Sequence, residues 1–111
     1  MEIDVTINFT QAIDLTAIPD YNGLPVPLDG PAVWSVVSGL STLGTALEGG
    51  APLPADGLMQ SLRSEDQPGD SRFRVAGPTA NGEIESFVNL HVVSPPANNI
   101  GLSAGAAYPK V

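Results

Sequence analysis

The side chains best suited to acid–base chemistry are few and are spread along the chain. His91 is the only histidine, and no nucleophile or carboxylate stands beside it in the sequence. A catalytic histidine needs such a partner within hydrogen-bond reach. We therefore expect His91 to lie on the surface, and the sequence predicts neither a catalytic residue nor an enzyme. A glycosidase built on two acids stays an open alternative, although 111 residues leave little room for a cleft.

Acidic residues are concentrated in one expected turn, at Glu65, Asp66 and Asp70, and Asp20 or Asp56 could join them from the same end of a sandwich. Calcium prefers several carboxylates and carbonyls in a flexible loop. The alternating acids typical of a calcium loop are missing, so a solvated turn is favoured. We predict no metal and no other cofactor. The chain has no cysteine, which excludes disulfides and thiolate sites.

Arg72 and Arg74 alternate with apolar residues and are expected on the outward face of a strand. They can form cross-strand pairs with Glu83 or Glu85, and docking on an acidic partner is the alternative. The formal net charge is −8, with twelve acidic residues against four basic ones. Such a chain repels phosphate backbones and anionic lipids, so we expect neither nucleic acid nor a membrane as a partner.

The elements that must position these residues are β-strands. Apolar and polar residues alternate from Glu2 to Phe9, which is the period of a half-buried strand. Further strands are predicted near 13–17, 32–38, 42–48, 58–62, 71–75 (ended by Ala76-Gly77-Pro78) and 84–94. Tight turns are predicted at Asn22-Gly23 and Asn81-Gly82. Twelve glycines and eleven prolines separate the apolar runs. This pattern is typical of an all-β sandwich of about seven short antiparallel strands.

The phase of the alternation also predicts the core and the limits of the domain. We expect a sandwich over residues 1–94 and an extended C-terminal arm over 95–111, since Pro95-Pro96 favours an extended chain. The predicted core residues are Trp34, Val36, Leu58, Leu62, Phe73, Val75, Val88, Leu90 and Val92.

Four pieces of sequence, in a fixed order, resemble a known family. They are Trp34-Ser35, Asp56-Gly57-Leu58, the stretch from Pro68-Gly69 to Val75, and the stretch from Val88 to Val93. Together, from Asp29 to Val93, they resemble bacterial group-2-type immunoglobulin-like domains, especially the small freestanding ones of phage structural proteins. The resemblance implies an immunoglobulin-like β-sandwich with Trp34 in the core, used for display, decoration or adhesion.

The functional expectation follows from this resemblance and from the arm. We expect a virion structural protein that decorates or cements a phage capsid, or sits on a tail, by non-covalent packing on the major capsid protein or another virion protein. Homo-oligomerisation stays open. With no signal peptide in the sequence, we expect synthesis in the host cytoplasm and a final place in the virion. The expected interface residues are Ile3, Val5, Ile100, Leu102 and Tyr108.

The alternative is a carbohydrate- or receptor-binding adhesion module. Such modules use exposed aromatic side chains, and the candidates are Tyr21, Phe87 and Tyr108.

Overall fold

The computed structural model describes residues 1–110 and is built almost entirely from β-strands. Strands make up 47% of the chain and helix 3%, so the all-β expectation is confirmed. The helical part is one 3-10 turn, Glu48–Gly50. The strands are β1 (Glu2–Asn8), β2 (Ala12–Thr16), β3 (Asp20–Tyr21), β4 (Leu24–Pro25), β5 (Val33–Ser38), β6 (Thr42–Leu43), β7 (Met59–Arg63), β8 (Gly69–Thr79) and β9 (Gly82–Val93).

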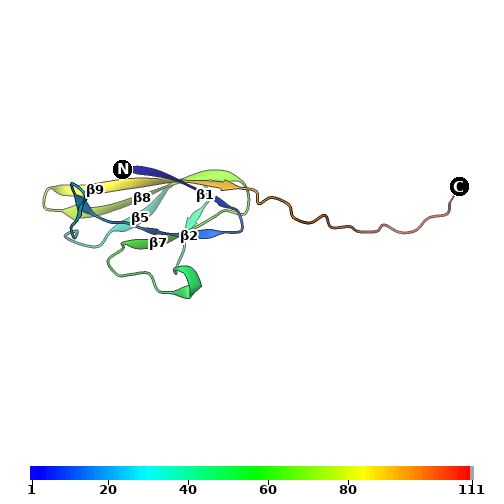
Figure 1. Ribbon diagram of the computed structural model, residues 1–111, viewed down its shortest axis with the longest axis horizontal. Helices are drawn as coiled ribbons and strands as arrows, with labels where there is room; N and C mark the ends of the chain where they lie inside the picture. Colours follow the sequence, from blue (N-terminus) through cyan, green and yellow to red (C-terminus); the bar gives the residue numbers. More distant parts are fainter. Residues whose placement is uncertain (111) are drawn as a thin grey trace.

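The strands form three sheets (Figure 1). The largest has four strands in the order β1-β9-β8-β5, the second has the order β2-β7-β6, and β3-β4 is a separate hairpin. Two details differ from the expectation of seven short antiparallel strands. β8 and β9 have 11 and 12 residues. β1 runs parallel to β9, from Glu2 opposite Phe87 to Asn8 opposite Val93. A parallel pair is feasible here because the whole chain between the two strands serves as the crossover connection.

The core lies where the four-stranded and three-stranded sheets meet. Phe73 and Leu90 of the larger sheet and Leu62 of the smaller one are fully buried. In β9 every second residue points inward, as the pleat of a strand requires. The buried core cluster consists of Ile7, Leu62, Phe73, Val88, Leu90 and Val92, with Val5, Phe9, Ile13, Leu15, Trp34 and Leu43 packed against it.

Trp34 and Val36 differ in how far they enter this core. Trp34 is half-buried, packs on the core cluster, and donates from Nε1 to the backbone carbonyl of Gly57 over 2.8 Å. Val36 pairs with the buried Phe73 and yet remains 43% exposed. Its predicted place in the core is therefore wrong. β5 is an edge strand, and the strand at the edge of the opposite sheet, β6, has only two residues to cover it.

The hairpin turns follow the Asn-Gly signals. Asn22 and Gly23 join β3 to β4 with φ of 50° and 85°, the positive values of a type I′ turn. Asn81 and Gly82 lie at the β8–β9 hairpin, in which Thr79 pairs with Gly82.

The predicted end of β8 at Pro78 is wrong, because the strand continues to Thr79. The Pro78 carbonyl accepts a hydrogen bond from the Asp29 N–H at 2.9 Å, on the side of β8 away from β9. The proline nitrogen faces that same side, beyond the last residue paired with β5, so no ladder hydrogen bond is lost.

The segment from Gly39 to Gly50 holds less strand than predicted. Only Thr42–Leu43 pair with β7, and the 3-10 turn at Glu48–Gly50 follows. Glycine is needed at the start, because Gly39 has a φ of 90° and a Cβ there would collide with Ser71.

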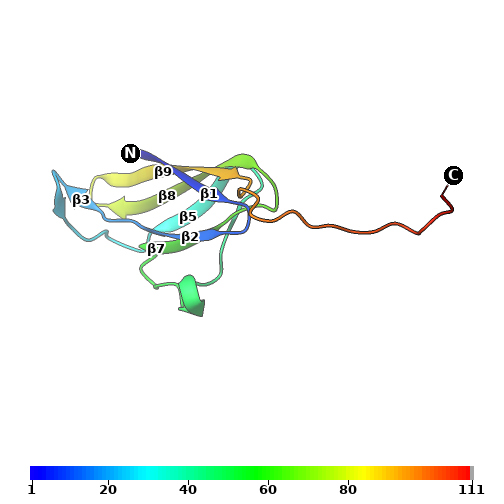
Figure 2. The same cartoon turned by 45° about the vertical axis from the view of Figure 1, so that its right-hand side comes forward.

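The last strand ends at Val93, and residues 94–110 form an arm without strand or helix. The arm continues outward from the end of β9 and makes the molecule long and narrow (Figures 1 and 2). The principal extents are 83 × 25 × 21 Å and the radius of gyration is 20.3 Å, whereas a compact chain of 100 residues has about 13 Å. Val111, the last residue of the predicted arm, lies outside the described residues.

Candidate functional site

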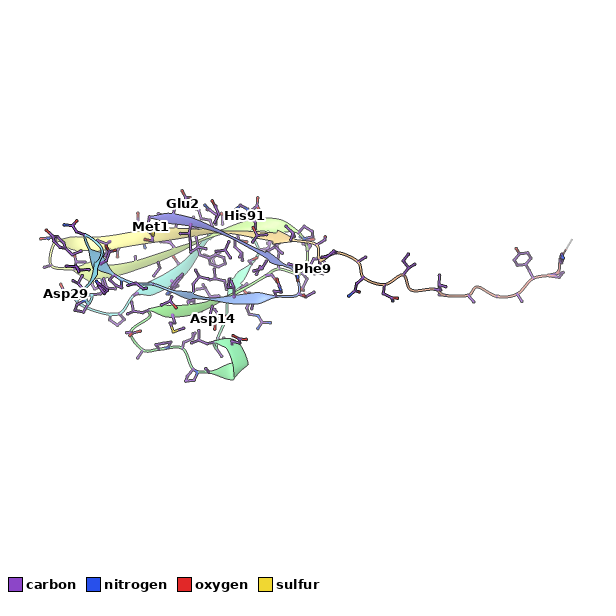
Figure 3. All side chains as sticks on the ribbon, in the orientation of Figure 1. Met1, Glu2, Phe9, Asp14, Asp29 and His91 are labelled. Atoms are coloured by element: carbon purple, nitrogen blue, oxygen red, sulfur yellow. The ribbon has the colours of Figure 1, made fainter. Side chains whose placement is uncertain are left out.

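The outer face of the four-stranded sheet carries a polar cluster that spans three strands. β1 and β9 lie in parallel register, and β8 flanks β9 on its other side. Their outward residues therefore stand in rows across the sheet, and Figure 3 shows Glu2 and His91 on this same side. The cluster consists of Glu2, Asp4, Asp70, Arg72, Asn89 and His91.

His91 lies between carboxylates from both neighbouring strands. Its Nδ1 is 3.0 Å from Oδ1 of Asp70, and its Nε2 is 3.3 Å from Oδ1 of Asp4. A protonated imidazole can donate to both carboxylates at once. These two hydrogen bonds, the one to Asp70 first, raise the pKa of His91 above its ordinary value of 6.5. Both ring nitrogens are occupied, which makes the histidine a cross-strand link.

Asn89 is the centre of the second half of the cluster. Its Nδ2 donates to Glu2 at 2.8 Å and to Asp4 at 3.1 Å, and its Oδ1 accepts from Arg72 at 2.9 Å. The hydrogen bond from Asn89 is the largest cause that lowers the pKa of Glu2, and Arg72 adds to it. Asn89 and then His91 lower the pKa of Asp4 in the same way. Both acids on β1 are thus held in their charged form.

The two outward arginines of β8 have different partners. Arg74 forms ion pairs with Glu83 and Glu85 of β9, so the predicted cross-strand pairing is confirmed for this residue. These two hydrogen bonds, the one to Glu85 first, raise the pKa of Arg74. Arg72 instead pairs with Glu2 of β1 and lies 4.2 Å above the ring of Phe87. Arg72 therefore reaches across β9 and connects β8 with β1.

Three of the five acids considered as calcium ligands have separate local contacts. Asp20 Oδ2 accepts from the Gly23 N–H at 2.8 Å, and Asp56 Oδ1 accepts from the Leu58 N–H at 3.0 Å. Asp70 contacts His91. Within residues 1–110 no group of three or more histidine or acidic side chains has the geometry to hold a metal ion.

A cavity of about 230 Å³ lies between the sheets. Its walls are mainly apolar, and of its two lining carboxylates, Asp20 and Glu85, the second is already paired with Arg74. The main apolar lining residues are Ile3, Leu15, Ile18, Leu28, Trp34 and Leu58. Leu58 and Val75, both predicted for the core, are only half-buried, and both line this cavity.

The expected interface residues fall into two separate regions. In β1, Ile3 is 40% exposed, whereas Val5 packs against the core. In the arm, Ile100, Leu102 and Tyr108 are 86%, 95% and 86% exposed. The arm thus presents large apolar side chains almost entirely to solvent.

The aromatic candidates for a ligand platform do not share a surface. Tyr21 lies in the β3–β4 hairpin, Phe87 lies beneath Arg72 on the outer sheet face, and Tyr108 lies in the arm.

The polar cluster around His91 is the feature that sequence reasoning missed. Asp4 is 87 residues from His91 along the chain and Asp70 is 21 residues away. The alternation in the first strand does predict that Glu2 and Asp4 share one face. Their neighbours depend on the parallel pairing with β9, for which the sequence carries no local signal.

The chain was also compared with known proteins. No protein-family model matches it, and no curated protein is similar to it in sequence. No helix within residues 1–110 has the length and apolar character of a membrane span.

Proposed function

We propose that the two packed sheets are an immunoglobulin-like β-sandwich. In immunoglobulin domains, strands C, F and G form one sheet and strands B, E and D belong to the other. Here β5, β8 and β9 are neighbours in one sheet and β2, β7 and β6 in the other, in matching chain order. Trp34 on β5 supports the assignment, since a buried tryptophan on strand C is a hallmark of these domains.

We further propose that the chain is a structural protein, which decorates or cements a phage capsid or tail by non-covalent packing. The observation that carries this proposal is the arm. Residues 94–110 extend away from the sheets, and Ile100, Leu102 and Tyr108 are almost fully exposed on them. Ordered apolar contacts for such a segment must come from another molecule. An assembly of many copies makes even weak contacts effective through avidity.

The outer sheet face is suited to this mechanical role. Glu2, Asn89 and Arg72 link three strands, and His91 links the same strands through two carboxylates. Cross-strand contacts of this kind stabilise a sheet. They hold β1, the first strand of the chain, onto the strand from which the arm leaves.

Quantitative mass spectrometry of purified particles from the source, compared with the soluble fraction, tests the role. We expect many copies per particle. Absence from particles would remove the virion proposal.

Deleting residues 97–111 tests whether the arm attaches the protein to particles. The truncated chain should remain folded and lose most of its retention on particles, because its exposed apolar anchors are gone. Tyr21→Ala is the matched control, since it removes an exposed aromatic from the hairpin and leaves the arm intact. Loss of retention with Tyr21→Ala but not with the deletion would assign the contact to the hairpin.

A further inference from the structure

β5 is the free edge of the four-stranded sheet, with regular pairing from Val33 to Val36 and a register shift between Val36 and Ser38. It stands last in the strand order β1-β9-β8-β5, and it pairs on one side only, with β8. Among the described residues, no backbone hydrogen bond joins its outer side to another segment. Such an edge presents free N–H and C=O groups that can pair with another chain.

The side chains along this edge do not prevent such pairing. No charged residue occurs between Gly30 and Leu47. Val33, Val37 and Leu40 are 65%, 51% and 67% exposed. By contrast, β1 at the opposite edge of the sheet carries Glu2 and Asp4, the kind of charge that protects an edge. The two edges of one sheet therefore differ, and only the β5 edge is suited to accept a strand.

The arm has the properties of a strand that such an edge accepts. Its residues 97–103 form no strand or helix on their own, and on pairing as a strand Ile100 and Leu102 would fall on one side because they are two residues apart. All twelve acids lie before residue 86, whereas Lys110 is the only charged side chain after residue 93. The arm therefore carries no acidic side chain that the acidic sheets of a second copy would repel.

The arm of one molecule is directed away from its own β5. It leaves from the end of β9, and β8 lies between β9 and β5. To reach its own β5, the chain would have to reverse at Ser94-Pro95-Pro96. A residue before proline is held extended, and consecutive prolines continue in an extended helix. The arm accordingly points outward, away from the sheets, in Figures 1 and 2.

Resting on the assembly role proposed above, we infer that the arm of one copy binds as an added strand to the β5 edge of a second copy. Each molecule has one arm and one acceptor edge, so the contact is heterologous. It links copies head to tail into rings or chains. Backbone hydrogen bonds supply the affinity, and Ile100 and Leu102 set the register against the exposed valines.

A complementation experiment with the full chain tests this inference. The edge variant is Val33→Lys, which places a charge on the regular part of β5. The arm variant is Ile100→Asn with Leu102→Asn, which leaves the net charge unchanged. Sedimentation velocity over a broad concentration series should show association of the wild-type chain. Each variant alone should associate at least about tenfold more weakly, because a charge or an amide replaces an apolar contact.

The mixture of the two variants gives the decisive result. The edge variant has an intact arm and the arm variant has an intact edge, so one productive contact forms per pair. We expect heterodimers and no larger species. Matched controls are Ile84→Lys, which adds the same charge on β9 of the same sheet, and Ser103→Asn in the arm. Both controls should associate as the wild-type chain does.

Three outcomes would overturn the inference. They are a wild-type chain that remains monomeric, an arm variant that associates normally, and a mixture of variants that stays monomeric. Retention on particles distinguishes this inference from the assembly role. If the wild-type chain is retained on particles but remains monomeric in solution, and the arm variant loses that retention, the arm binds a different protein. If copies associate as inferred but particles lack the protein, the virion proposal fails alone.

Discussion

At the scale of single residues, the environment of His91 has a measurable consequence for stability. The pKa of His91 is raised in the folded protein by Asp70 and Asp4, relative to an ordinary value of 6.5. The charged form is therefore favoured by folding. Its contribution to the free energy of unfolding is complete below pH 6.5, and it is lost as the pH rises through the raised pKa.

We therefore predict that the urea concentration at the midpoint of unfolding decreases as the pH is raised from 6 to 8. His91→Gln should remove this dependence on pH. NMR titration of the imidazole should give a pKa above 6.5, lowered by Asp70→Asn. Asp66→Asn is the control, because it removes the same charge from the turn before β8. An imidazole pKa at or below 6.5 in the wild-type chain would contradict the geometry of the pair.

Gly57 is a second residue with a specific structural role. It has a φ of 71°, its carbonyl accepts the hydrogen bond of Trp34, and a Cβ on it would collide with the Ala32 carbonyl. Gly23 also has a positive φ, of 85°, but nothing lies within 4 Å of the place of its Cβ. The two glycines therefore separate the cost of backbone conformation from the cost of the collision.

We predict that Gly23→Ala lowers the free energy of unfolding by about 1–2 kcal/mol, the cost of a left-handed alanine. Gly57→Ala should cost about 1–3 kcal/mol more, because overpacking is added to it. Chemical denaturation of both variants measures the difference. An equal decrease in the free energy of unfolding for both variants would mean that the loop around Gly57 shifts and avoids the collision with Ala32.

At the scale of elements, β1 depends on its contacts with β9 and β8. It pairs with β9 alone, in parallel register, and its polar side chains are bound by Asn89, Arg72 and His91. Parallel pairing is slightly less stable per residue than antiparallel pairing. The side-chain contacts therefore decide how often this strand opens.

We predict that Asn89→Ala weakens the attachment of β1 by about 0.2–1 kcal/mol, the range for cross-strand pairs. Amide hydrogen exchange should become faster from Ile3 to Ile7 and remain unchanged in β7. Arg74→Ala is the matched variant, since the partners of Arg74 lie near the β8–β9 hairpin. If Arg74→Ala accelerates amide exchange in β1 and Asn89→Ala does not, the contacts that hold β1 do not involve Asn89.

The elements also show what the sequence can and cannot predict. Alternation predicted β1 and the inward face of β9, and Asn22-Gly23 predicted a turn, because these signals depend only on neighbouring residues. The exposure of Val36 depends on the length of β6 in the opposite sheet. The cluster around His91 depends on strand order. Such features arise from pairing between distant segments, which local patterns do not specify.

At the scale of the whole molecule, the arm accounts for the elongated shape. The 83 Å length includes residues 94–110, which extend beyond the last strand (Figure 1). We predict that deleting residues 97–111 reduces the radius of gyration of the monomer from 20.3 Å to about 13 Å without changing the thermal midpoint. Small-angle scattering at low concentration and a thermal scan measure both. A lower midpoint would show that the arm also stabilises the sheets.

Because β1 pairs in parallel with β9, β1 begins away from the arm and runs toward the end of the sheet from which the arm leaves. Glu2 lies beside Phe87, in the middle of β9, whereas the arm leaves after Val93 at the end of that strand. Figure 1 shows Met1 on the side away from the arm. A cargo fused before Met1, such as a fluorescent protein or an antigen, would therefore be presented outward from any surface that holds the arm. Under the proposed assembly role, the strand direction would separate the region used for attachment from the region available for display.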